Sequence, residues 1–383
     1  MRTIPLVVPA ILAILSCRSG DAQGPAQRSP TPGSIENVVR VDTVARGLAN
    51  PWGLEFLPDG RMIVTERPGQ VRIVSADGRV GPALAGVPAV QARGQGGMLD
   101  VALDPEFAQN RMVYLSFSEP GEGGAGTSVA KGRLAAGDAA LENVQVIYRQ
   151  QPKVSGAGHF GSRIVFRGDG TIFITQGDRQ SYRDQAQELE SGLGKVVRIN
   201  RDGTIPRDNP FVGRNNVRPE IWSYGHRNMQ GAALHPETGR LWTIEHGARG
   251  GDELNHPEAG KNYGWPVITY GRDYSGRSIG VGAVKEGMEQ PVYYWDPVIA
   301  PSGMAIYTGD RYPGWKGSIF VGSMSPGGLV RLEMRGDSVV KEERYLGDLR
   351  KRIRDVKQGP DGYLYLVTDE SDGMILRVVP LQR

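Results

Sequence analysis

From about residue 38 onward, the chain alternates short apolar runs with turns rich in glycine, proline and aspartate. A strand-like run, a tight turn and a second strand-like run together form the pattern of a β-hairpin. This pattern occurs in six places, at residues 53–66, 99–117, 163–178, 231–247, 302–323 and 356–369. Few long helical patterns lie between the copies, so the sequence predicts an all-β protein.

The distances between the hairpins indicate how they are arranged. Consecutive turns lie more than about 40 residues apart, which is longer than a solenoid repeat and fits propeller blades that carry inserted loops. Such spacing leaves room for four strands in each repeat. The sequence therefore predicts a six-bladed β-propeller with four-stranded antiparallel blades over residues 38–383. Two separate β-sandwiches would need a linker in mid-chain, and none is visible.

In most copies the second strand ends in polar residues. These ends are Thr65-Glu66, Gln176-Gly177-Asp178, Glu245-His246-Gly247, Gly322-Ser323 and Thr368-Asp369. If the blades are equivalent, all of these ends lie on one face around the central channel. Polar groups that converge from several blades are what a ligand site requires. We therefore expect the functional site on this face.

The N-terminus has the composition of an export signal. A short basic start precedes an apolar run at residues 4–15, which is too short to span a membrane. The run ends in I-L-S-C, which looks like a bacterial lipobox, and Cys17 is the single cysteine of the chain. We predict a lipoprotein-type signal peptide at 1–16, a lipid anchor on Cys17 as the one membrane contact, and a flexible tether at 17–37. The alternative is plain secretion after cleavage at Ala22.

Charge and cysteine content exclude some classes of function. The net charge is +3, and lysine and arginine are scattered among acids, so no basic stripe predicts a nucleic-acid partner. One cysteine cannot form a disulfide within the chain, so packing, and a metal if one binds, must hold the fold.

The densest polar cluster lies at residues 224–266. It reads Y-G-H-R-N-M-Q-G, then E-H-G-A-R-G-G-D-E, then G-K-N-Y-G-W-P. Ordinary strands and turns do not need so many hydrogen-bonding side chains, so the cluster indicates strand ends that face one shared space. These motifs resemble the glucose/sorbosone dehydrogenase family, and its soluble aldose sugar dehydrogenases most closely, over about residues 38–380. The resemblance implies a six-bladed propeller that binds pyrroloquinoline quinone (PQQ) and calcium.

His159 is the candidate base. It lies in V-S-G-A-G-H-F-G-S-R, where small neighbours leave the imidazole approachable, and Asp178 at the end of the same hairpin could fix its tautomer. A lone loop histidine is ordinarily an exposed, structural one. The resemblance instead implies that His159 takes the proton of the anomeric hydroxyl and that Asp178 orients it.

Arg227, Asn228 and Gln230 follow His226 in G-H-R-N-M-Q-G. The resemblance implies that this group binds the cofactor. A guanidinium at Arg227 could hydrogen-bond a quinone oxygen and stabilise the charge that develops on reduction. For His226 we expect a structural role instead, in hydrogen bonds between blades.

Further cofactor contacts are implied on other blades. Gln95, in a glycine-rich loop, matches a position that contacts substrate or cofactor. Arg352 and Arg354 alternate along a strand and so share a face, where paired guanidinium groups suit the carboxylates of PQQ. A lysine that faces the cofactor in well-known relatives is replaced here, with Ser325 at the nearest matching place. The loss of this cation should weaken PQQ binding or shift its redox balance.

Calcium is implied at two places. The resemblance places the catalytic ion on the backbone carbonyls of Gly247 and Ala248, and a structural ion at Glu253 and the carbonyl of Tyr263. Calcium prefers oxygen ligands of these kinds.

The function that this resemblance implies is PQQ- and calcium-dependent oxidation of the C1 hydroxyl of aldose sugars to lactones. Hydride would pass to PQQ, and electrons would pass to an acceptor in or near the membrane, on the periplasmic side of the cell envelope. Two alternatives stay open: a non-catalytic propeller that binds sugar or protein, and a calcium-dependent lactonase. The sequence does not decide the preferred sugar, or whether the protein is a monomer or a homodimer.

Overall fold

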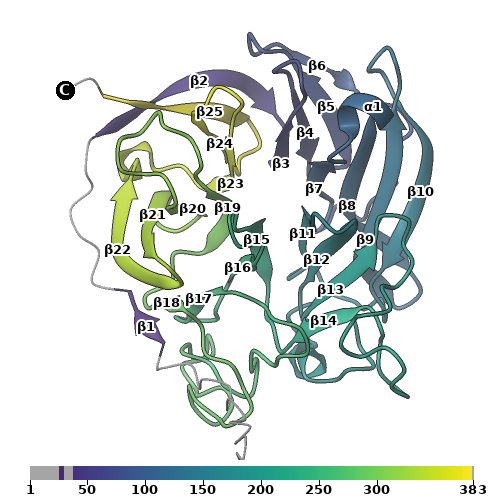
Figure 1. Cartoon of the computed structure of the whole chain (residues 1–383), viewed down its shortest axis with the longest axis vertical. Helices are drawn as coiled ribbons and strands as arrows, with labels where there is room; N and C mark the ends of the chain where they lie inside the picture. Colours follow the sequence, from purple (N-terminus) through teal and green to yellow (C-terminus); the bar gives the residue numbers. More distant parts are fainter. Residues whose placement is uncertain (1–25, 30–37, 382–383) are drawn as a thin grey trace, which may run out of the picture.

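The computed structural model describes residues 26–29 and 38–381. Six sheets surround a central axis (Figure 1). Within each sheet the strands follow one another in chain order from the inner to the outer edge, except that β1 and β2, from the start of the chain, form outer edges of two sheets. Helix is limited in the described residues to α1 (Phe107–Asn110) and the 3₁₀ turns η1 (Arg183–Ala186) and η2 (Gly347–Leu349). The prediction of a six-bladed propeller with four-stranded antiparallel blades is confirmed.

The first three blades are built from consecutive strands. Blade 1 contains β3 (Pro51–Phe56), β4 (Met62–Glu66), β5 (Gln70–Val74) and β6 (Val80–Ala83). Blade 2 contains β7 (Met98–Leu103), β8 (Met112–Gly121), β9 (Gly124–Leu134) and β10 (Leu141–Arg149). Blade 3 contains β11 (Gly161–Phe166), β12 (Thr171–Gln176), β13 (Lys195–Asn200) and β14 (Ile221–Tyr224).

The remaining blades include the strands near both ends of the chain. Blade 4 contains β15 (Met229–Leu234), β16 (Leu241–Glu245), β17 (Asp252–Asn255) and β18 (Tyr293–Trp295). Blade 5 contains β19 (Pro301–Ile306), β20 (Ile319–Ser323), β21 (Gly328–Arg335) and β22 (Ser338–Tyr345). Blade 6 contains β23 (Ile353–Gln358), β24 (Leu364–Thr368), β25 (Gly373–Pro380) and β2 (Val39–Leu48).

The ring is closed by β2, which pairs antiparallel with β25 from Val39 opposite Pro380 to Leu48 opposite Gly373. A further strand, β1 (Gln27–Arg28), pairs in parallel with β18 at the outer edge of blade 4. It lies within the segment predicted to be a tether. The predicted signal peptide and Cys17 lie outside the described residues. Among the described helices, none is long and apolar enough to cross a membrane.

Apolar contacts between adjacent blades form the core. The second strands of the inner hairpins are buried along their length in blade 1 and in blades 3 to 6. One cluster fills each junction, as where Ile63 of β4 meets Leu115 of β8, and where Val64 of β4 meets Val367 of β24. Because every blade packs on two neighbours, burial of apolar surface stabilises the ring as one unit.

A buried ion cluster occupies the centre of the ring. The Arg163 guanidinium on β11 lies 2.8 Å from Asp100 on β7 and 2.9 Å from Asp355 on β23. Its Nε also donates to the carbonyl of Gln230 on β15 at 2.7 Å. Removing one partner from such a cluster leaves a buried charge uncompensated. The cluster therefore ties four inner strands together directly below the polar strand ends.

Each inner hairpin contains a register shift close to the same end of its blade. Shifts of this kind bend the strand and redirect side chains. In blades 1 to 3 a hydroxyl on the second strand accepts the N–H at the shift at 2.9 Å, in the pairs Thr65 with Gly53, Ser116 with Asp100, and Thr175 with Arg163. The repeated register shift therefore redirects side chains at the same end of every blade.

Candidate functional site

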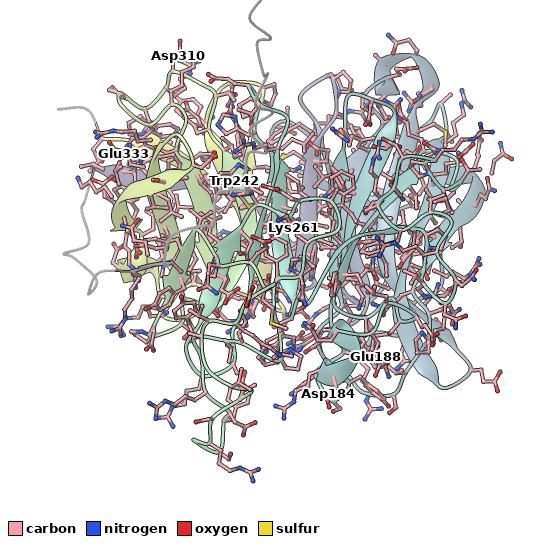
Figure 2. The ribbon with its side chains drawn as sticks, turned by 60° about the horizontal axis from the view of Figure 1, so that its bottom comes forward. Asp184, Glu188, Trp242, Lys261, Asp310 and Glu333 are labelled. Carbon is pink, nitrogen blue, oxygen red and sulfur yellow. The ribbon has the colours of Figure 1, made fainter. Side chains whose placement is uncertain are left out.

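The polar strand ends gather at one end of the propeller, as the sequence predicts. Figure 2 shows Asp184 and Glu188, from the loop after β12, at one end of the molecule, and Asp310, from the turn between β19 and β20, at the other. The ends of β12, β16 and β24 lie at the former end. Charged and titratable side chains from these ends interact at His246. Burial is the main cause that lowers the pKa of His246, and the charges of Arg227, His159 and Arg354 add to this effect.

His159 and Asp178 form a close pair at the end of blade 3. The Nδ1 of His159 lies 2.6 Å from Oδ1 of Asp178. His159 has a positive φ of 52°, an unusual conformation that turns its side chain out of the run of the strand. The imidazole is only 6% exposed, so it is buried rather than openly approachable. The predicted pairing with Asp178 is present in the structure.

Asp178 accepts hydrogen bonds at both oxygens. Oδ1 also accepts the backbone N–H of Gln180 at 2.7 Å, and Oδ2 accepts the indole N–H of Trp265 at 2.7 Å. Burial opposes ionisation of the carboxyl, but the hydrogen bond and charge of His159 and the charge of Arg227 outweigh it and lower the pKa of Asp178. Asp178 is thus an ionised acceptor that fixes Nδ1–H on His159.

The remaining nitrogen of His159 is available for chemistry. Burial is the main cause that lowers the pKa of His159; Asp178 opposes this effect, while the charges of Arg227 and Arg179 add to it. Within residues 26–29 and 38–381, Nε2 has no hydrogen-bond partner. A neutral imidazole with an unshared Nε2 can accept a proton near neutral pH.

Arg227 lies between the two blades that carry the pair and the predicted calcium carbonyls. Its Nη1 donates to the carbonyl of His246 at 3.1 Å and to that of Gly247. Its backbone N–H donates to Glu245 Oε2 at 2.7 Å, and its guanidinium lies 5.2 Å from the centre of the Trp265 ring. Nη2 faces the hydroxyl of Tyr274 at 3.4 Å.

The predicted cofactor residues of blades 4 and 6 meet each other. Arg354 Nη1 donates to Gln230 Oε1 at 2.6 Å, and its Nη2 donates to Asp369 Oδ2 at 2.8 Å. Arg352 contacts the same carboxylate oxygen at 3.3 Å, which confirms that the two arginines share a side. Arg354 is buried, whereas Arg352 is about half exposed. A pair of guanidinium groups anchored by one carboxylate retains positive charge for an anionic ligand.

Several buried polar atoms beside these residues have no partner within the described chain. They are Arg227 Nε, Asn228 Nδ2, His246 Nε2, Arg354 Nε and both amide atoms of Gln176. Asn228 Oδ1, in contrast, accepts the N–H of Gly161 at 3.1 Å, so only the oxygen of the side-chain amide has a partner. Buried polar atoms without partners are costly, and a bound polar ligand is one explanation for them.

Gln95 supports the base from the side of blade 2. Its Oε1 accepts the backbone N–H of His159 at 2.8 Å, and its own N–H donates to Ala157 at 2.8 Å. Its side chain lies in an exposed loop. In this structure Gln95 therefore positions the His159 loop, and Ser325, which is exposed after β20, does not take part in that network.

The predicted structural calcium residues line a small cavity. It has a volume of about 10 Å³ and includes Glu245, Glu253, Tyr263 and Gly247 in its wall. Burial, and then the negative charge of Glu245, raise the pKa of Glu253 well above its usual range. Two buried carboxylates that repel each other favour a cation, and the volume suits a single small ion.

The predicted catalytic calcium carbonyls are already in contact with a cation. Arg227 donates to the carbonyl of Gly247, and Ala248 is buried beside it. Such oxygens favour positive charge, so the donor chemistry suits calcium. No group of three or more His, Cys, Asp or Glu side chains in the described residues is placed to hold a metal ion.

Three residues of the site were not found by sequence reasoning. Trp265 donates to Asp178, and Tyr274 reaches Arg227 from an exposed loop. Arg179 is fully buried and donates to the carbonyls of Gly156 and Gly158, so it supports the loop that carries His159. The G-W-P motif could have drawn attention to Trp265, and the position directly after Asp178 could have drawn attention to Arg179. Neither signal indicates which residue the side chain would contact.

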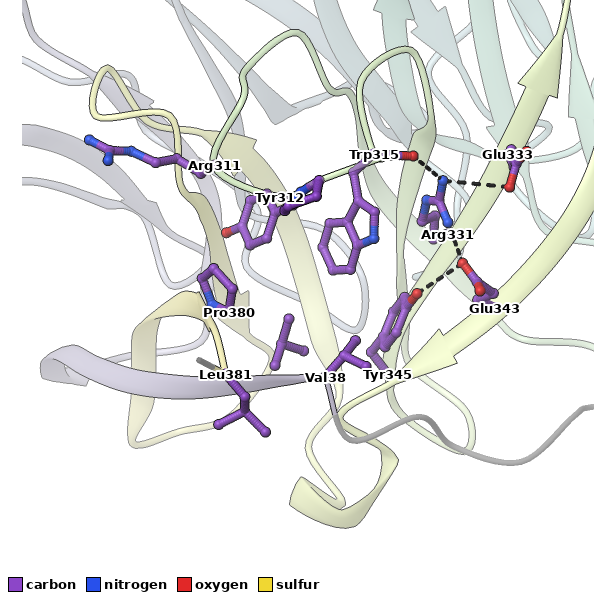
Figure 3. Close-up of a pocket in the computed structure, with 13 residues that line it drawn as sticks. Val38, Arg311, Tyr312, Trp315, Arg331, Glu333, Glu343, Tyr345, Pro380 and Leu381 are labelled. Carbon is purple, nitrogen blue, oxygen red and sulfur yellow. Dashed lines mark hydrogen bonds and ion pairs between the residues drawn. The ribbon is translucent and has the colours of Figure 1, made fainter. Parts of the chain in front are cut away.

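A much larger cavity lies elsewhere, between blades 5 and 6. Figure 3 shows this groove of about 860 Å³, whose wall includes Tyr312, Trp315, Arg331, Glu343 and Tyr345. Two of its charged groups pair with each other, since Arg331 contacts Glu343, and the Tyr345 hydroxyl also donates to Glu343 at 2.9 Å. The chemistry of the strand ends, rather than cavity size, therefore identifies the candidate site.

The chain is similar to known sugar dehydrogenases. A family model described as glucose/sorbosone dehydrogenase matches residues 48–377. An aldose sugar dehydrogenase of Escherichia coli (strain K12) is 47% identical over 346 residues, which cover 89% of this chain and 93% of the relative.

Solved structures give the same picture. A crystal structure of a glucose dehydrogenase has 52% sequence identity and a TM-score of 0.88, and covers 90% of this chain and 100% of that chain. The PQQ-bound form of an aldose sugar dehydrogenase from Streptomyces coelicolor has 29% identity and a TM-score of 0.73, and covers 90% of this chain and 100% of that chain.

Proposed function

The chain belongs to the glucose/sorbosone dehydrogenase family, and on that premise we propose that it is a PQQ- and calcium-dependent aldose dehydrogenase. It oxidises the C1 hydroxyl of an aldose to the lactone. The observation that carries the proposal is the buried His159–Asp178 pair, whose unshared Nε2 lies in a site that also holds Arg227. Oxidation of an alcohol needs a proton acceptor, and the pair supplies one.

The residues present fit PQQ. PQQ is a tricarboxylate, and Arg227, Arg352 and Arg354 provide positive charge at one end of the propeller. Asn228 Nδ2 and the Nε atoms of Arg227 and Arg354 are buried donors without partners in the described chain. Donors of this kind suit carboxylate and quinone oxygens.

The chain's own residues perform the proton chemistry. When bound, PQQ supplies the two-electron acceptor that receives the C1 hydrogen as hydride. His159 Nε2 takes the proton from the C1 hydroxyl, while Asp178 holds Nδ1–H and stabilises the imidazolium that forms. Arg227 provides a fixed positive charge next to the reacting group, which requires no reorganisation during the reaction. The sugar thus loses one hydride and one proton, and the lactone is the product.

Calcium is assigned to two groups of oxygens. The carbonyls of Gly247 and Ala248 would hold the ion that acts as a Lewis acid on the cofactor. Glu253 and the Tyr263 carbonyl would hold the structural ion, together with Glu245 in the wall of the same cavity. The raised pKa of Glu253, caused by burial and then by Glu245, supports a cation between these carboxylates.

The enzyme is assigned to the periplasmic side of the cell envelope. Electrons pass from it to an acceptor in or near the membrane, and Cys17 carries the lipid anchor. Replacing Cys17 with Ala should move the protein from the membrane fraction to the soluble fraction. A wild-type protein that is soluble and begins after Ala22 would overturn the anchor.

A titration of apoprotein with PQQ tests the proposal as a whole. We expect saturable binding at micromolar PQQ in excess calcium, its loss on chelation, and dye reduction when an aldose is added. Absence of saturable binding would instead favour a non-catalytic propeller. Hydrolysis of a lactone without PQQ would favour the lactonase alternative.

A further inference from the structure

Trp265 links the two chemical groups of the site. Its indole Nε1 donates to Asp178 Oδ2 at 2.7 Å, and its ring lies 5.2 Å from the guanidinium carbon of Arg227. It comes from the segment between β17 and β18, 87 residues from Asp178 in sequence, and is only 7% exposed. One buried ring thus contacts both the partner of the base and the arginine.

The backbone of Trp265 is fixed by two other loops. Its N–H donates to the carbonyl of Gly225 at 2.9 Å, and its carbonyl accepts Gln187 Nε2 at 2.8 Å. Gln187 and Asn262 also exchange hydrogen bonds through both amide atoms, at 2.8 and 3.0 Å. These contacts hold the indole in one orientation behind the carboxylate.

A buried tryptophan is most often only a packing residue, and Trp265 does pack with Ala186, Ala248 and Ile279. Its polar atom argues for more. Most side-chain hydrogen bonds in proteins go to the backbone or to water, whereas this indole N–H bonds an ionised carboxylate that also contacts the candidate base. Trp295 offers a comparison, since its Nε1 donates to Glu342 at 3.0 Å far from His159.

We propose that Trp265 is a positioning residue of the proton-accepting pair, which holds Asp178 so that its other oxygen stays aligned on Nδ1 of His159. The proposal rests on the proposed function and adds Trp265 to the His159–Asp178 pair as a third residue. Trp265 touches neither sugar nor proton. It acts by occupying Oδ2, so that Asp178 cannot rotate and part of its negative charge is engaged away from His159.

The physical consequence has a definite sign. Without the indole N–H, Oδ2 is left buried and unpartnered, and the charge of Asp178 concentrates on the oxygen that faces His159. A stronger negative charge next to the imidazole favours the imidazolium, so the pKa of His159 rises. The other charges that act on His159, from Arg227 and Arg179, stay in place, and His246 is a further close neighbour.

The test compares Trp265→Phe with Trp295→Phe in holoenzyme loaded with PQQ and calcium. Each variant removes one indole-to-carboxylate hydrogen bond and keeps an aromatic ring. We expect Trp265→Phe to lower kcat by about tenfold, with KM for the aldose little changed, because a hydrogen bond to a charged group is lost. We also expect the acid limb of the kcat/KM profile to move upward by roughly half a pH unit or more.

The control and a second variant keep the test decisive. Trp295→Phe should reduce thermal stability and leave the acid limb where it is in the wild type. If Trp265→Phe does not fold, site-specific benzothienylalanine at position 265 replaces the N–H with sulfur and keeps the ring shape. An acid limb that matches wild type in either Trp265 variant would overturn the proposal, as would an equal shift in Trp295→Phe.

The two proposals fail in different ways. If the proposed function is wrong, wild-type protein binds no PQQ or His159→Ala turns over normally. If only the role of Trp265 is wrong, His159→Ala is inactive while the Trp265→Phe profile is unchanged.

Discussion

Two buried histidine–carboxylate pairs lie at the ends of neighbouring blades, and their second ring nitrogens distinguish them. In blade 3, His159 Nδ1 lies 2.6 Å from Asp178; in blade 4, His226 Nδ1 lies 3.0 Å from Glu245. His226 Nε2, however, also bonds the Ser223 hydroxyl at 2.9 Å. Nε2 of His159 has no such partner in the described residues.

The His226–Glu245 pair also makes more contacts with its surroundings. The His226 ring is stacked on Tyr263 with centroids 4.7 Å apart, and Glu245 also accepts the N–H of Arg227. All polar atoms of that pair are used to join strands and loops. A carboxylate partner therefore does not by itself make a histidine a base, because an unshared nitrogen is also needed.

The largest expected effect separates the two histidines. His159→Ala should lower turnover by about 10²–10⁴-fold, which is typical for loss of a general base, and leave PQQ binding intact. His226→Ala should instead lower the free energy of unfolding by roughly 2–4 kcal/mol, because two buried hydrogen bonds and a stacked ring are lost. Steady-state dye reduction and thermal unfolding of both variants check this contrast. Equal loss of turnover in both, without loss of stability in His226→Ala, would remove the distinction.

The next effect concerns cofactor affinity. Arg354→Met should weaken PQQ binding by roughly 10–150-fold, since a charge-assisted contact contributes about 1.5–3 kcal/mol. Arg352→Met should fall at the lower end of that range, because Arg352 is half exposed and water can replace its contact. Equilibrium titration with PQQ measures both, with Arg311→Met at the opposite end of the propeller as the matched control. Unchanged affinity in Arg354→Met would remove it from the cofactor site.

Ser325 gives an opposite test of the same pocket. Ser325→Lys should tighten PQQ binding if its side chain faces the cofactor, because it restores a cation near Arg352. The same titration applies. Unchanged affinity would mean that position 325 does not face the cofactor.

The pH dependence tests the blade 3 pair alone. Asp178 is the group that raises the pKa of His159 against burial and the charges of Arg227 and Arg179. Asp178→Asn should therefore lower that pKa further, so the acid limb of kcat/KM moves to lower pH while kcat falls. The limb reflects loss of activity as His159 gains a proton on acidification. A limb that does not move, or moves upward, would contradict the assignment of Asp178.

Calcium should have the smallest effect, on stability. A chelator should lower the melting temperature by a few degrees, because an ion that binds only the folded state stabilises it by mass action. Glu253→Gln should remove most of this calcium-dependent difference, since it removes one carboxylate of the small cavity. Differential scanning fluorimetry with and without calcium measures it. A full calcium response in Glu253→Gln would exclude Glu253 as a ligand.

The blades could be predicted because their signals are local. A hairpin such as residues 53–66 carries both strands and its turn within one short segment, and all six predicted hairpins form inner hairpins of blades. The pairing of β2 with β25 joins opposite ends of the chain, and the pairing of β1 with β18 falls in a segment predicted to be a tether. No local pattern specifies such contacts.

The site divides along the same line. His159 and Asp178 lie on one hairpin, so sequence could pair them. Trp265 lies 87 residues from Asp178, and Gln95 lies 64 residues from His159, so only the closed ring reveals what they hold. The contact of Arg227 with the carbonyl of Gly247 likewise depends on the tertiary structure, because Arg227 precedes β15 and Gly247 follows β16 in blade 4.

Chemical rescue tests the central claim, that His159 is the base, most directly. His159→Ala holoenzyme, loaded with PQQ and calcium, is assayed for aldose-dependent dye reduction as imidazole is added. We expect turnover about 10²–10⁴-fold below wild type without imidazole, and a saturable increase with imidazole, because the added base replaces the missing one. Turnover close to wild type in the absence of imidazole would contradict it.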